Sequence, residues 1–289
     1  IDQSSLIREA CKWDYELRFP EQIFDVTDRA HGIATSTPKG PVYVSLPREV
    51  LSETIPAGGS ARRPQMRGVD IGAVAAQMAE VAELIAQADH PVIFAQHGAG
   101  TPEAFDALSR LTERWGIAVC QYWAVELAVP TTHPMATDPD PRALLDRADV
   151  ILCLDALAPW APGQAEPREE ARVIQIGPRP LAERSGVRNF RCDLGLTSEV
   201  APAILALEHA LEAHWPDRAQ DATARRDALA RTHAAQQEKR FSSAMAQRDA
   251  AALAKPWISL TLSRALAGRD AAVFSELGCQ LPSMQLTRH

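Results

Sequence analysis

Long apolar runs, paired cysteines and a surplus of basic residues are all missing from this sequence, and each absence excludes a class of protein. No apolar run approaches the roughly 20 residues that a membrane-spanning helix needs, and no signal-like segment opens the chain. The chain carries 30 Lys and Arg against 37 Asp and Glu, a formal net charge of -7, whereas a nucleic-acid-binding surface needs a basic face. We therefore expect a cytoplasmic protein that binds neither a membrane nor a nucleic acid.

The five cysteines are few, scattered and never arranged as Cys-x-x-Cys. An odd number of unpaired thiols fits a reducing compartment and argues against a structural zinc site. We expect most of them to be core thiols: Cys11, Cys120, Cys153, Cys192 and Cys279.

What is present is an ordinary globular composition, with 46% hydrophobic and 23% charged residues. A chain of 289 residues exceeds what one hydrophobic core usually serves, so about two domains, or one domain with additional pieces, are expected.

The most informative stretch is residues 90–100. A short apolar, partly β-branched run leads into Gly98 and Gly100, and residues 102–115 then place apolar side chains at helical spacing. This pattern predicts a buried parallel strand that enters a helix through a tight turn. Glu103 stands where a dinucleotide-binding fingerprint needs a third small residue, so we interpret the two glycines as structural.

Further strands and helices alternate after this unit, which predicts an α/β fold with a doubly wound parallel sheet of Rossmann-like, flavin- or NAD-binding-like topology. Such a sheet binds ligands beyond the carboxyl ends of its strands. A helix from residue 198 to about 214 closes the unit. The other expected strands are residues 117–120, 149–155 and 171–177, with a short fifth at 189–192, and the side chains expected to be nearly fully buried are Val150, Ile151, Leu152, Val173, Ile174 and Ile176.

The two ends of the chain have a different organisation. The first residues have a helical pattern, residues 23–33 form a second helical face, and residues 42–47 form a strand without an evident partner. We therefore expect the tail of a domain whose earlier strands are not in the chain. After a Pro- and Gly-rich linker, a helix carrying Val74 to Ile85 enters the central unit.

Beyond the central unit, residues 216–254 lack glycine and are rich in Ala, Arg, Gln and Asp, which predicts a solvated connecting helix or two. Another amphipathic helix follows Pro256, and residues 271–278 resemble a strand and turn that open a further domain.

Six segments spread along the chain resemble, in the same order, segments of the thiamine-diphosphate-dependent enzymes of the acetolactate synthase type. This family includes benzoylformate decarboxylase. The resemblance implies four regions: 1–55 as the C-terminal part of a pyrimidine-binding domain, 69–215 as the central α/β domain, 216–255 as a helical connector and 256–289 as the start of a diphosphate-binding domain. The segments that carry it are residues 39–50, 91–100, 132–135, 148–152, 172–180 and 272–278.

The resemblance implies a lyase or transferase that breaks or forms C–C bonds on a 2-keto acid with thiamine diphosphate and Mg²⁺, assembled as a homo-dimer or homo-tetramer. Gly278, Cys279 and Gln280 resemble the turn at which the family's diphosphate domain approaches the cofactor. We expect cofactor binding from these three residues. The sequence determines neither the keto acid nor the choice between decarboxylation and carboligation.

Two family features are absent from the 289 residues: the Gly-Asp-Gly motif that holds Mg²⁺ and the glutamate that contacts the aminopyrimidine ring. No catalytic or metal-binding residue is therefore assigned. We expect the chain to be part of a longer protein, inactive alone and weak in binding thiamine diphosphate. A flavin or ADP is disfavoured because Asp155 stands where many relatives have a small glycine. In addition, Asp155 and Glu103 would repel a phosphate.

Two histidines and two tryptophans complete the candidates. His133 lies in a His-Pro turn, for which a structural role is favoured, and His97 is left unassigned although imidazole titrates near neutrality. Trp123 and Trp160 follow strand ends, where a nucleotide of the central domain would lie.

Two other classes of function stay open. Gly98 to Thr101 suggests an NAD-dependent deacylase, but the zinc-binding cysteine pairs and a His-Gly segment are missing. The second alternative is a non-catalytic nucleotide-binding or scaffold α/β module.

Overall fold

The structure is a computed structural model. It forms two compact units, Ile1–Ile71 and Gly72–His289. The residues that it describes are 3–54, 66, 68–69, 71–72, 75–182, 190–250, 252–276 and 279–288. No helix in these ranges combines the length and the apolar character needed to cross a membrane.

The first unit contains a two-stranded parallel sheet, β1 (Trp13–Glu16) beside β2 (Val42–Ser45), packed against helix α1 (Ile23–Thr35). Lys12 ties the sheet to the end of α1, because its Nζ atom donates to the carbonyl oxygens of Ile33 at 2.8 Å and Ser36 at 2.7 Å. The shorter elements of this unit are 3₁₀ helices at Gln3–Leu6, Arg8–Ala10 and Pro20–Gln22, and α2 (Arg48–Leu51).

Strand β1 corrects the sequence analysis at this end of the chain. The expected opening helix is wrong, because two 3₁₀ turns occupy it and a strand follows. Trp13 and Tyr15 alternate along β1 on one face, with their rings stacked 5.7 Å apart, a pairing that an extended strand allows and a helix does not. The partner of β2 is therefore inside the chain.

The second unit is built on a five-stranded parallel sheet of order β4-β3-β5-β6-β7. The fold-class prediction of an α/β protein with a central parallel sheet is confirmed. Strand order reverses between β3 and β5, so their carboxyl ends form the topological switch point of the sheet. The strands are β3 (Pro91–Ala95), β4 (Ala118–Cys120), β5 (Val150–Leu154), β6 (Arg172–Gly177) and β7 (Leu194–Thr197).

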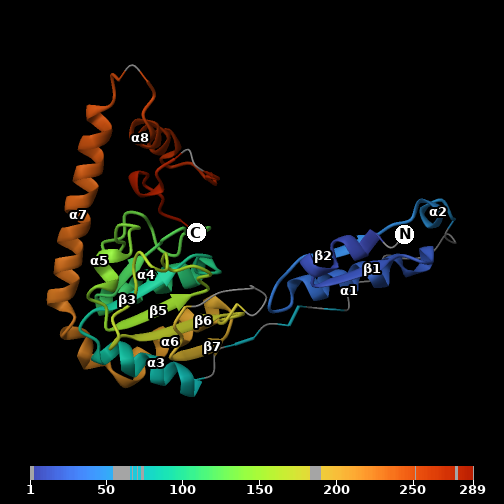
Figure 1. Ribbon diagram of the computed structural model, residues 1–289, viewed down its shortest axis with the longest axis horizontal. Helices are drawn as coiled ribbons and strands as arrows, with labels where there is room; N and C mark the ends of the chain where they lie inside the picture. Colours follow the sequence, from blue (N-terminus) through green and yellow to red (C-terminus); the bar gives the residue numbers. More distant parts are fainter. Residues whose placement is uncertain are drawn as a thin grey trace. The chain divides into compact units, whose positions relative to one another are not determined.

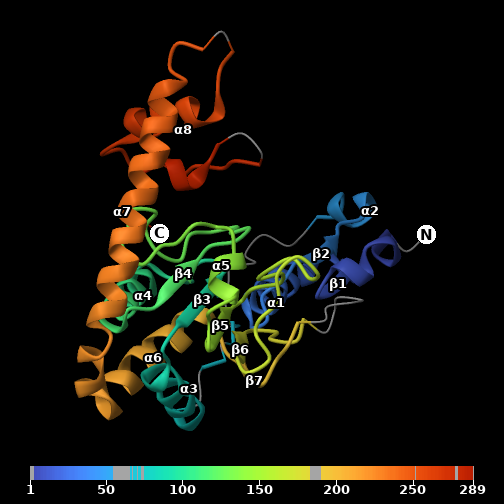
Figure 2. The ribbon, with the colours of Figure 1, turned by 60° about the vertical axis from the view of Figure 1, so that its left-hand side comes forward.

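Three helices cover one face of this sheet, α3 (Ala75–Gln87), α4 (Pro102–Trp115) and α6 (Val200–His214), and α6 packs against the other two (Figures 1 and 2). The opposite face packs on short α5 (Arg142–Leu145), on the loop that carries Trp160 and on Leu229. The six side chains expected to be buried have exposed fractions of 5% or less: Val150, Ile151, Leu152, Val173, Ile174 and Ile176.

The fifth strand is displaced from its expected position at residues 189–192. Asn189 lies outside the described residues, and Phe190 to Cys192 are not extended into the sheet, so the expectation is wrong for them. Phe190 packs edge-on against Trp160 at 5.3 Å instead. The strand forms at β7, where Leu196 points into the core and is 1% exposed.

Helices continue after the sheet with a 3₁₀ turn (Pro216–Gln220) and the 24-residue α7 (Thr223–Ala246), where one or two connecting helices are expected, and with α8 (Lys255–Leu266), where a further amphipathic helix is expected. Helix α7 runs from the sheet to the C-terminal segment that contains α8 (Figures 1 and 2). The strand expected at 271–278 is wrong for residues 271–276, which pair with none of the described strands and leave Phe274 95% exposed. Leu277 and Gly278 lie outside the described residues.

Candidate functional site

The carboxyl edge of the sheet is held together by Gln96, which follows β3 directly. Its side-chain Nε2 donates to the carbonyl oxygens of Tyr122 at 2.9 Å and Ala158 at 2.8 Å, and its Oε1 accepts from the Ala158 amide at 3.0 Å. The loops that leave β4 and β5 are thereby fixed to the end of the strand between them. This edge is a rigid platform rather than a set of independent loops.

Gly98 and Gly100 make the tight turn that the sequence predicts, with φ angles of +70° and +83°. Side chains would be strained there, and a Cβ atom on Gly98 would lie 3.0 Å from Glu126. Thr101 then caps α4 by accepting from the Ala104 amide at 3.2 Å. Their interpretation as structural glycines agrees with this geometry.

His97 and Asp155 form a charged pair at the switch point. The Nδ1 atom of His97 donates to the Asp155 carbonyl oxygen at 2.6 Å and lies 3.3 Å from its carboxylate Oδ2. Asp155 holds a φ of +39°, a backbone conformation uncommon for residues other than glycine. Hydrogen bonding to Asp155 raises the pKa of His97 to about 9. Because the imidazolium offsets the carboxylate, Asp155 repels an anion less than it would alone.

His133 is a structural histidine, as expected. Its Nε2 donates to the Ser109 carbonyl oxygen at 3.1 Å, its Nδ1 accepts from the Met135 amide at 3.2 Å, and the ring is only 7% exposed. Burial lowers its pKa, so the neutral ring that this bonding requires is the favoured form.

The two tryptophans expected together at strand ends are separated. Trp160 is 1% exposed and packs edge-on against Phe94 at 5.7 Å, inside the core. Trp123 is 80% exposed. The shared nucleotide position expected for them is therefore wrong for Trp160.

The thiols also divide into two groups. Cys120 and Cys153 are fully buried core residues, and burial raises the pKa of Cys120 to about 12. Cys11, Cys192 and Cys279 are partly exposed, so the expectation of core thiols is wrong for these three.

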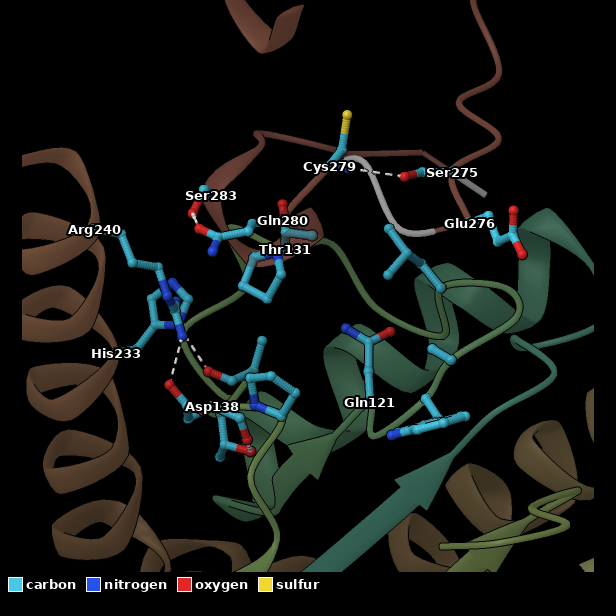
Figure 3. A pocket seen from close by; sticks show the side chains of 17 residues that line it. Gln121, Thr131, Asp138, His233, Arg240, Ser275, Glu276, Cys279, Gln280 and Ser283 are labelled. Atoms are coloured by element: carbon cyan, nitrogen blue, oxygen red, sulfur yellow. Dashed lines mark hydrogen bonds and ion pairs between the residues drawn. The ribbon is translucent and has the colours of Figure 1, made fainter. Parts of the chain in front are cut away.

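A cavity of about 490 Å³ opens at the carboxyl end of β4, between the central sheet, α7 and the C-terminal segment (Figure 3). Gln121, the first residue after β4, lines it and closes its own loop by accepting from the Ala128 amide at 2.8 Å. Thr131 fixes the opposite wall, because its hydroxyl donates to the Met284 carbonyl at 2.6 Å and accepts from the Leu286 amide at 2.9 Å.

Two of the three residues expected at the cofactor turn, Cys279 and Gln280, line this cavity. The backbone N–H of Cys279 donates to the Ser275 hydroxyl at 3.0 Å, and the backbone N–H of Gln280 donates to the Ser259 hydroxyl at 2.9 Å. The Cys279 sulfur points away from Gln121 and Asp138, whereas the side-chain amide of Gln280 lies on the side of Thr131 and Arg240 (Figure 3). Gly278, the third, lies outside the described residues.

Sequence reasoning missed the charged wall of the cavity. Arg240 on α7 donates to Asp138 Oδ2 at 2.9 Å, and its side chain is only 18% exposed. His233, two turns earlier on the same face of α7, donates from Nδ1 to the Ala136 carbonyl at 2.7 Å. Each of these two residues on α7 lies about a hundred positions from its partner in the sequence. The segments that carry the partners contain no motif that could have signalled the contact.

The described lining does not fit a metal-bound diphosphate. Among the residues that the structure describes, no group of three His, Cys, Asp or Glu side chains could hold a metal ion. Arg240 is already paired with Asp138, and Glu276 adds a negative charge. The neutral polar groups of Gln280, Thr131 and Gln121 fit uncharged polar parts of a ligand instead.

Comparison with known proteins defines the class. Residues 78–207 match the family model described as "Thiamine pyrophosphate enzyme, central domain". These residues form a central domain of the kind found in thiamine-diphosphate-dependent enzymes, as the resemblance indicated. The matched residues carry the five-stranded sheet, helix α4 and parts of α3 and α6.

Individual relatives narrow the choice of reaction only in part. The chain is similar to sulfoacetaldehyde acetyltransferase of Rhodobacter capsulatus, with 30% identity over 224 residues, covering 71% of this chain and 36% of the relative. It is also 30% identical to a probable acetolactate synthase large subunit of Methanocaldococcus jannaschii over 141 residues, 47% of this chain and 24% of the relative. The chain thus spans about a third or less of these relatives.

Solved structures show the same fold. Benzoylformate decarboxylase from Polynucleobacter necessarius superposes with a TM-score of 0.58 at 20% sequence identity, covering 70% of this chain and 38% of that one. At this identity the likeness defines the arrangement of strands and helices and not the reaction.

Proposed function

We propose that this chain acts as part of a thiamine-diphosphate-dependent enzyme that cleaves or forms a C–C bond of a 2-keto acid. The observation that carries the proposal is the family match over residues 78–207 together with the cavity at the end of β4 that Cys279 and Gln280 line. The relatives named above include a probable acetolactate synthase and an acetyltransferase named for sulfoacetaldehyde, which is an aldehyde, so the keto acid of the proposal is supported by the first of them only.

Thiamine diphosphate, when bound, supplies the electron sink for the bond that breaks. The part of this chain is to shape the wall of the site. Gln280 presents an amide that can donate and accept hydrogen bonds, and Thr131 holds residues 284–286 in place behind it. The Asp138–Arg240 pair fixes α7 against the same wall.

Mg²⁺ belongs to the proposal as the counter-ion of the diphosphate. This ion needs hard oxygen ligands. The described residues do not provide them, so we propose that the diphosphate is held elsewhere in the assembled enzyme. A flavin is not part of the proposal. We propose a homo-dimer or homo-tetramer as the assembled form.

The test uses the polypeptide encoded by the whole reading frame to which residues 1–289 belong, supplied with thiamine diphosphate, Mg²⁺ and a panel of 2-keto acids. We expect release of CO₂ or a carboligation product from at least one of them. Gln280→Leu should lower kcat/KM at least roughly tenfold, which corresponds to about 1.4 kcal/mol of transition-state stabilisation. Product analysis and steady-state kinetics measure both.

Gln285→Leu is the matched control, because Gln285 lies in the same segment, is exposed and does not line the cavity. Full activity in Gln280→Leu would remove this residue from the proposed site. Absence of any thiamine-dependent turnover with every keto acid would favour the non-catalytic nucleotide-binding or scaffold module.

Residues 1–289 alone are expected to bind thiamine diphosphate weakly or not at all, because the described cavity has no free cation facing a diphosphate. Calorimetric titration of this polypeptide measures the affinity. Saturable, Mg²⁺-dependent binding at low micromolar affinity would contradict this expectation.

A further inference from the structure

His233 on α7 is one of two polar side chains that the fold buries in the described lining of the cavity at the carboxyl end of β4 (Figure 3). The residue is 8% exposed, and the other such residue is Thr131 at 6%. Nδ1 of His233 lies 2.7 Å from the Ala136 carbonyl oxygen. A carbonyl oxygen only accepts hydrogen bonds, so Nδ1 carries the proton, and Nε2 of the neutral ring is an acceptor.

This second ring nitrogen of His233 is unpaired but still accessible. Nε2 has no hydrogen bond in the part of the chain that the structure describes. The side-chain atoms that are both unpaired and fully buried there are Trp115 Nε1, Trp160 Nε1 and Gln236 Oε1. Nε2 is not one of them and therefore keeps accessible surface. Since the rest of the residue is buried and it lines the cavity, this surface opens into the cavity.

Several other acceptor side chains of this lining are already in use or lie in solvent. Both carboxylate oxygens of Asp138 accept from donors of the chain, and so do the Thr131 hydroxyl and Gln121 Oε1. Glu276 is exposed, so water competes for its carboxylate. His233 Nε2 is thus a sheltered lone pair that no described donor fills.

We propose that His233 makes this cavity select a 2-keto acid that carries a hydroxyl group, because the ligand hydroxyl donates to Nε2. The inference rests on the proposed function and adds the substrate class to it. A substrate with a methyl group in place of the hydroxyl displaces water from Nε2 and gives no donor in return, which costs binding energy. His233 is therefore a specificity-determining residue of the site.

The test compares 3-hydroxypyruvate with 2-oxobutanoate, which has a methyl group in place of the hydroxyl and the same number of non-hydrogen atoms. Both acids are supplied to the whole-reading-frame polypeptide with thiamine diphosphate and Mg²⁺, and steady-state kinetics gives kcat/KM for each. The two acids also differ in intrinsic reactivity. The decisive quantity is therefore the change in the ratio of their kcat/KM values on substitution.

Two variants separate the ligand contact of His233 from its structural contact. His233→Asn keeps an amide N–H near the position of Nδ1 and has no atom at that of Nε2, so the ratio should fall roughly five- to tenfold. His233→Gln brings its amide oxygen near the position of Nε2 and should retain part of the preference. His209→Asn is the control, because His209 is exposed on α6 and does not line the cavity, and it should leave the ratio unchanged.

A binding measurement gives a second readout that does not need turnover. Both acids are titrated by calorimetry into the same polypeptide without thiamine diphosphate. We expect 3-hydroxypyruvate to bind roughly five- to tenfold more tightly than 2-oxobutanoate, and His233→Asn to remove this difference. If His233→Asn does not fold, the two affinities in the unmodified protein still test the proposal.

An unchanged ratio in His233→Asn, or equal affinity of the two acids for the unmodified protein, would overturn this proposal and leave the proposed function intact. Absence of turnover with every 2-keto acid would instead count against the proposed function, and the affinities alone then decide on His233. No binding of 3-hydroxypyruvate at millimolar concentration would overturn its role.

Discussion

At the scale of single residues, neighbours that are distant in sequence decide what a side chain does. His97 follows one strand and Asp155 another, 58 positions later, and only the parallel pairing of β3 with β5 brings them to 2.6 Å. His133 differs in part, because one of its two partners, the Met135 amide, lies two residues away in the same turn, whereas the Ser109 carbonyl lies 24 positions away.

The His97–Asp155 pair predicts a pH dependence of stability. The folded pKa of His97, about 9, lies above its ordinary value of 6.5, so folding takes up a proton between these values. The stabilisation is fully present below pH 6.5 and is lost as the pH rises through about 9. Asp155→Asn should remove most of this dependence, as measured by urea unfolding across this range and by NMR titration of His97.

Asp106→Asn provides the matched control, since Asp106 is an exposed acid on α4. It should leave the titration of His97 unchanged. A His97 pKa near 6.5 in the unmodified protein would contradict the pairing.

At the scale of elements, burial on both faces makes the central strands recognisable from sequence. The continuous apolar runs of β3 and β5 have no polar face, because helices cover one side and α5 with its neighbouring loops the other. Strand β7 lies at the edge and has a weaker pattern, and its position was misjudged. Edge strands depend on the neighbour that pairs with them.

Truncation of a central strand should be costly. Ile151 of β5 is 0% exposed and packs in the cluster on the α5 side. Ile151→Ala should lower the free energy of unfolding by roughly 2–5 kcal/mol through lost burial and the cavity left behind. Chemical denaturation measures it, with Leu157→Ala as control because Leu157 is 52% exposed. A change near zero in Ile151→Ala would contradict its place in the core.

One side chain near the start of α7 joins it to the ends of two other helices. Arg225 donates to the carbonyl oxygens of Ala88, Trp115 and Gly116 near the ends of α3 and α4. Arg225→Met leaves these carbonyls unpaired and should lower the free energy of unfolding by about 2–3 kcal/mol. Arg226→Met is the control, because Arg226 forms a long ion pair of 3.9 Å with the exposed Asp227, and it should cost little. Denaturation curves and hydrogen exchange along α7 compare the two.

At the scale of the whole molecule, apolar side chains are left exposed in the first unit. Phe19 is 60% exposed and Leu51 59%. Together with the family, this supports assembly into a homo-dimer or homo-tetramer of the whole-reading-frame polypeptide. Sedimentation at micromolar concentration is the measurement, and a strict monomer would count against it.

The sequence by itself determined the class of fold and the family. Local patterns carry this information: β-branched runs for the strands, helical spacing for α4 and α6, and glycines at a turn that no other residue enters without strain. The order of family-like segments added the cofactor class. The assignment of Cys279 and Gln280 depends on this resemblance alone.

Tertiary structure alone decided the rest. The opening strand β1 forms because β2 accepts it as a partner, and residues 271–276 stay irregular because no described strand does. The Asp138–Arg240 pair and the Arg225 contacts each join segments far apart in the chain. Such contacts leave no periodic trace in the sequence, because their energy comes from neighbours that only the folded chain brings together.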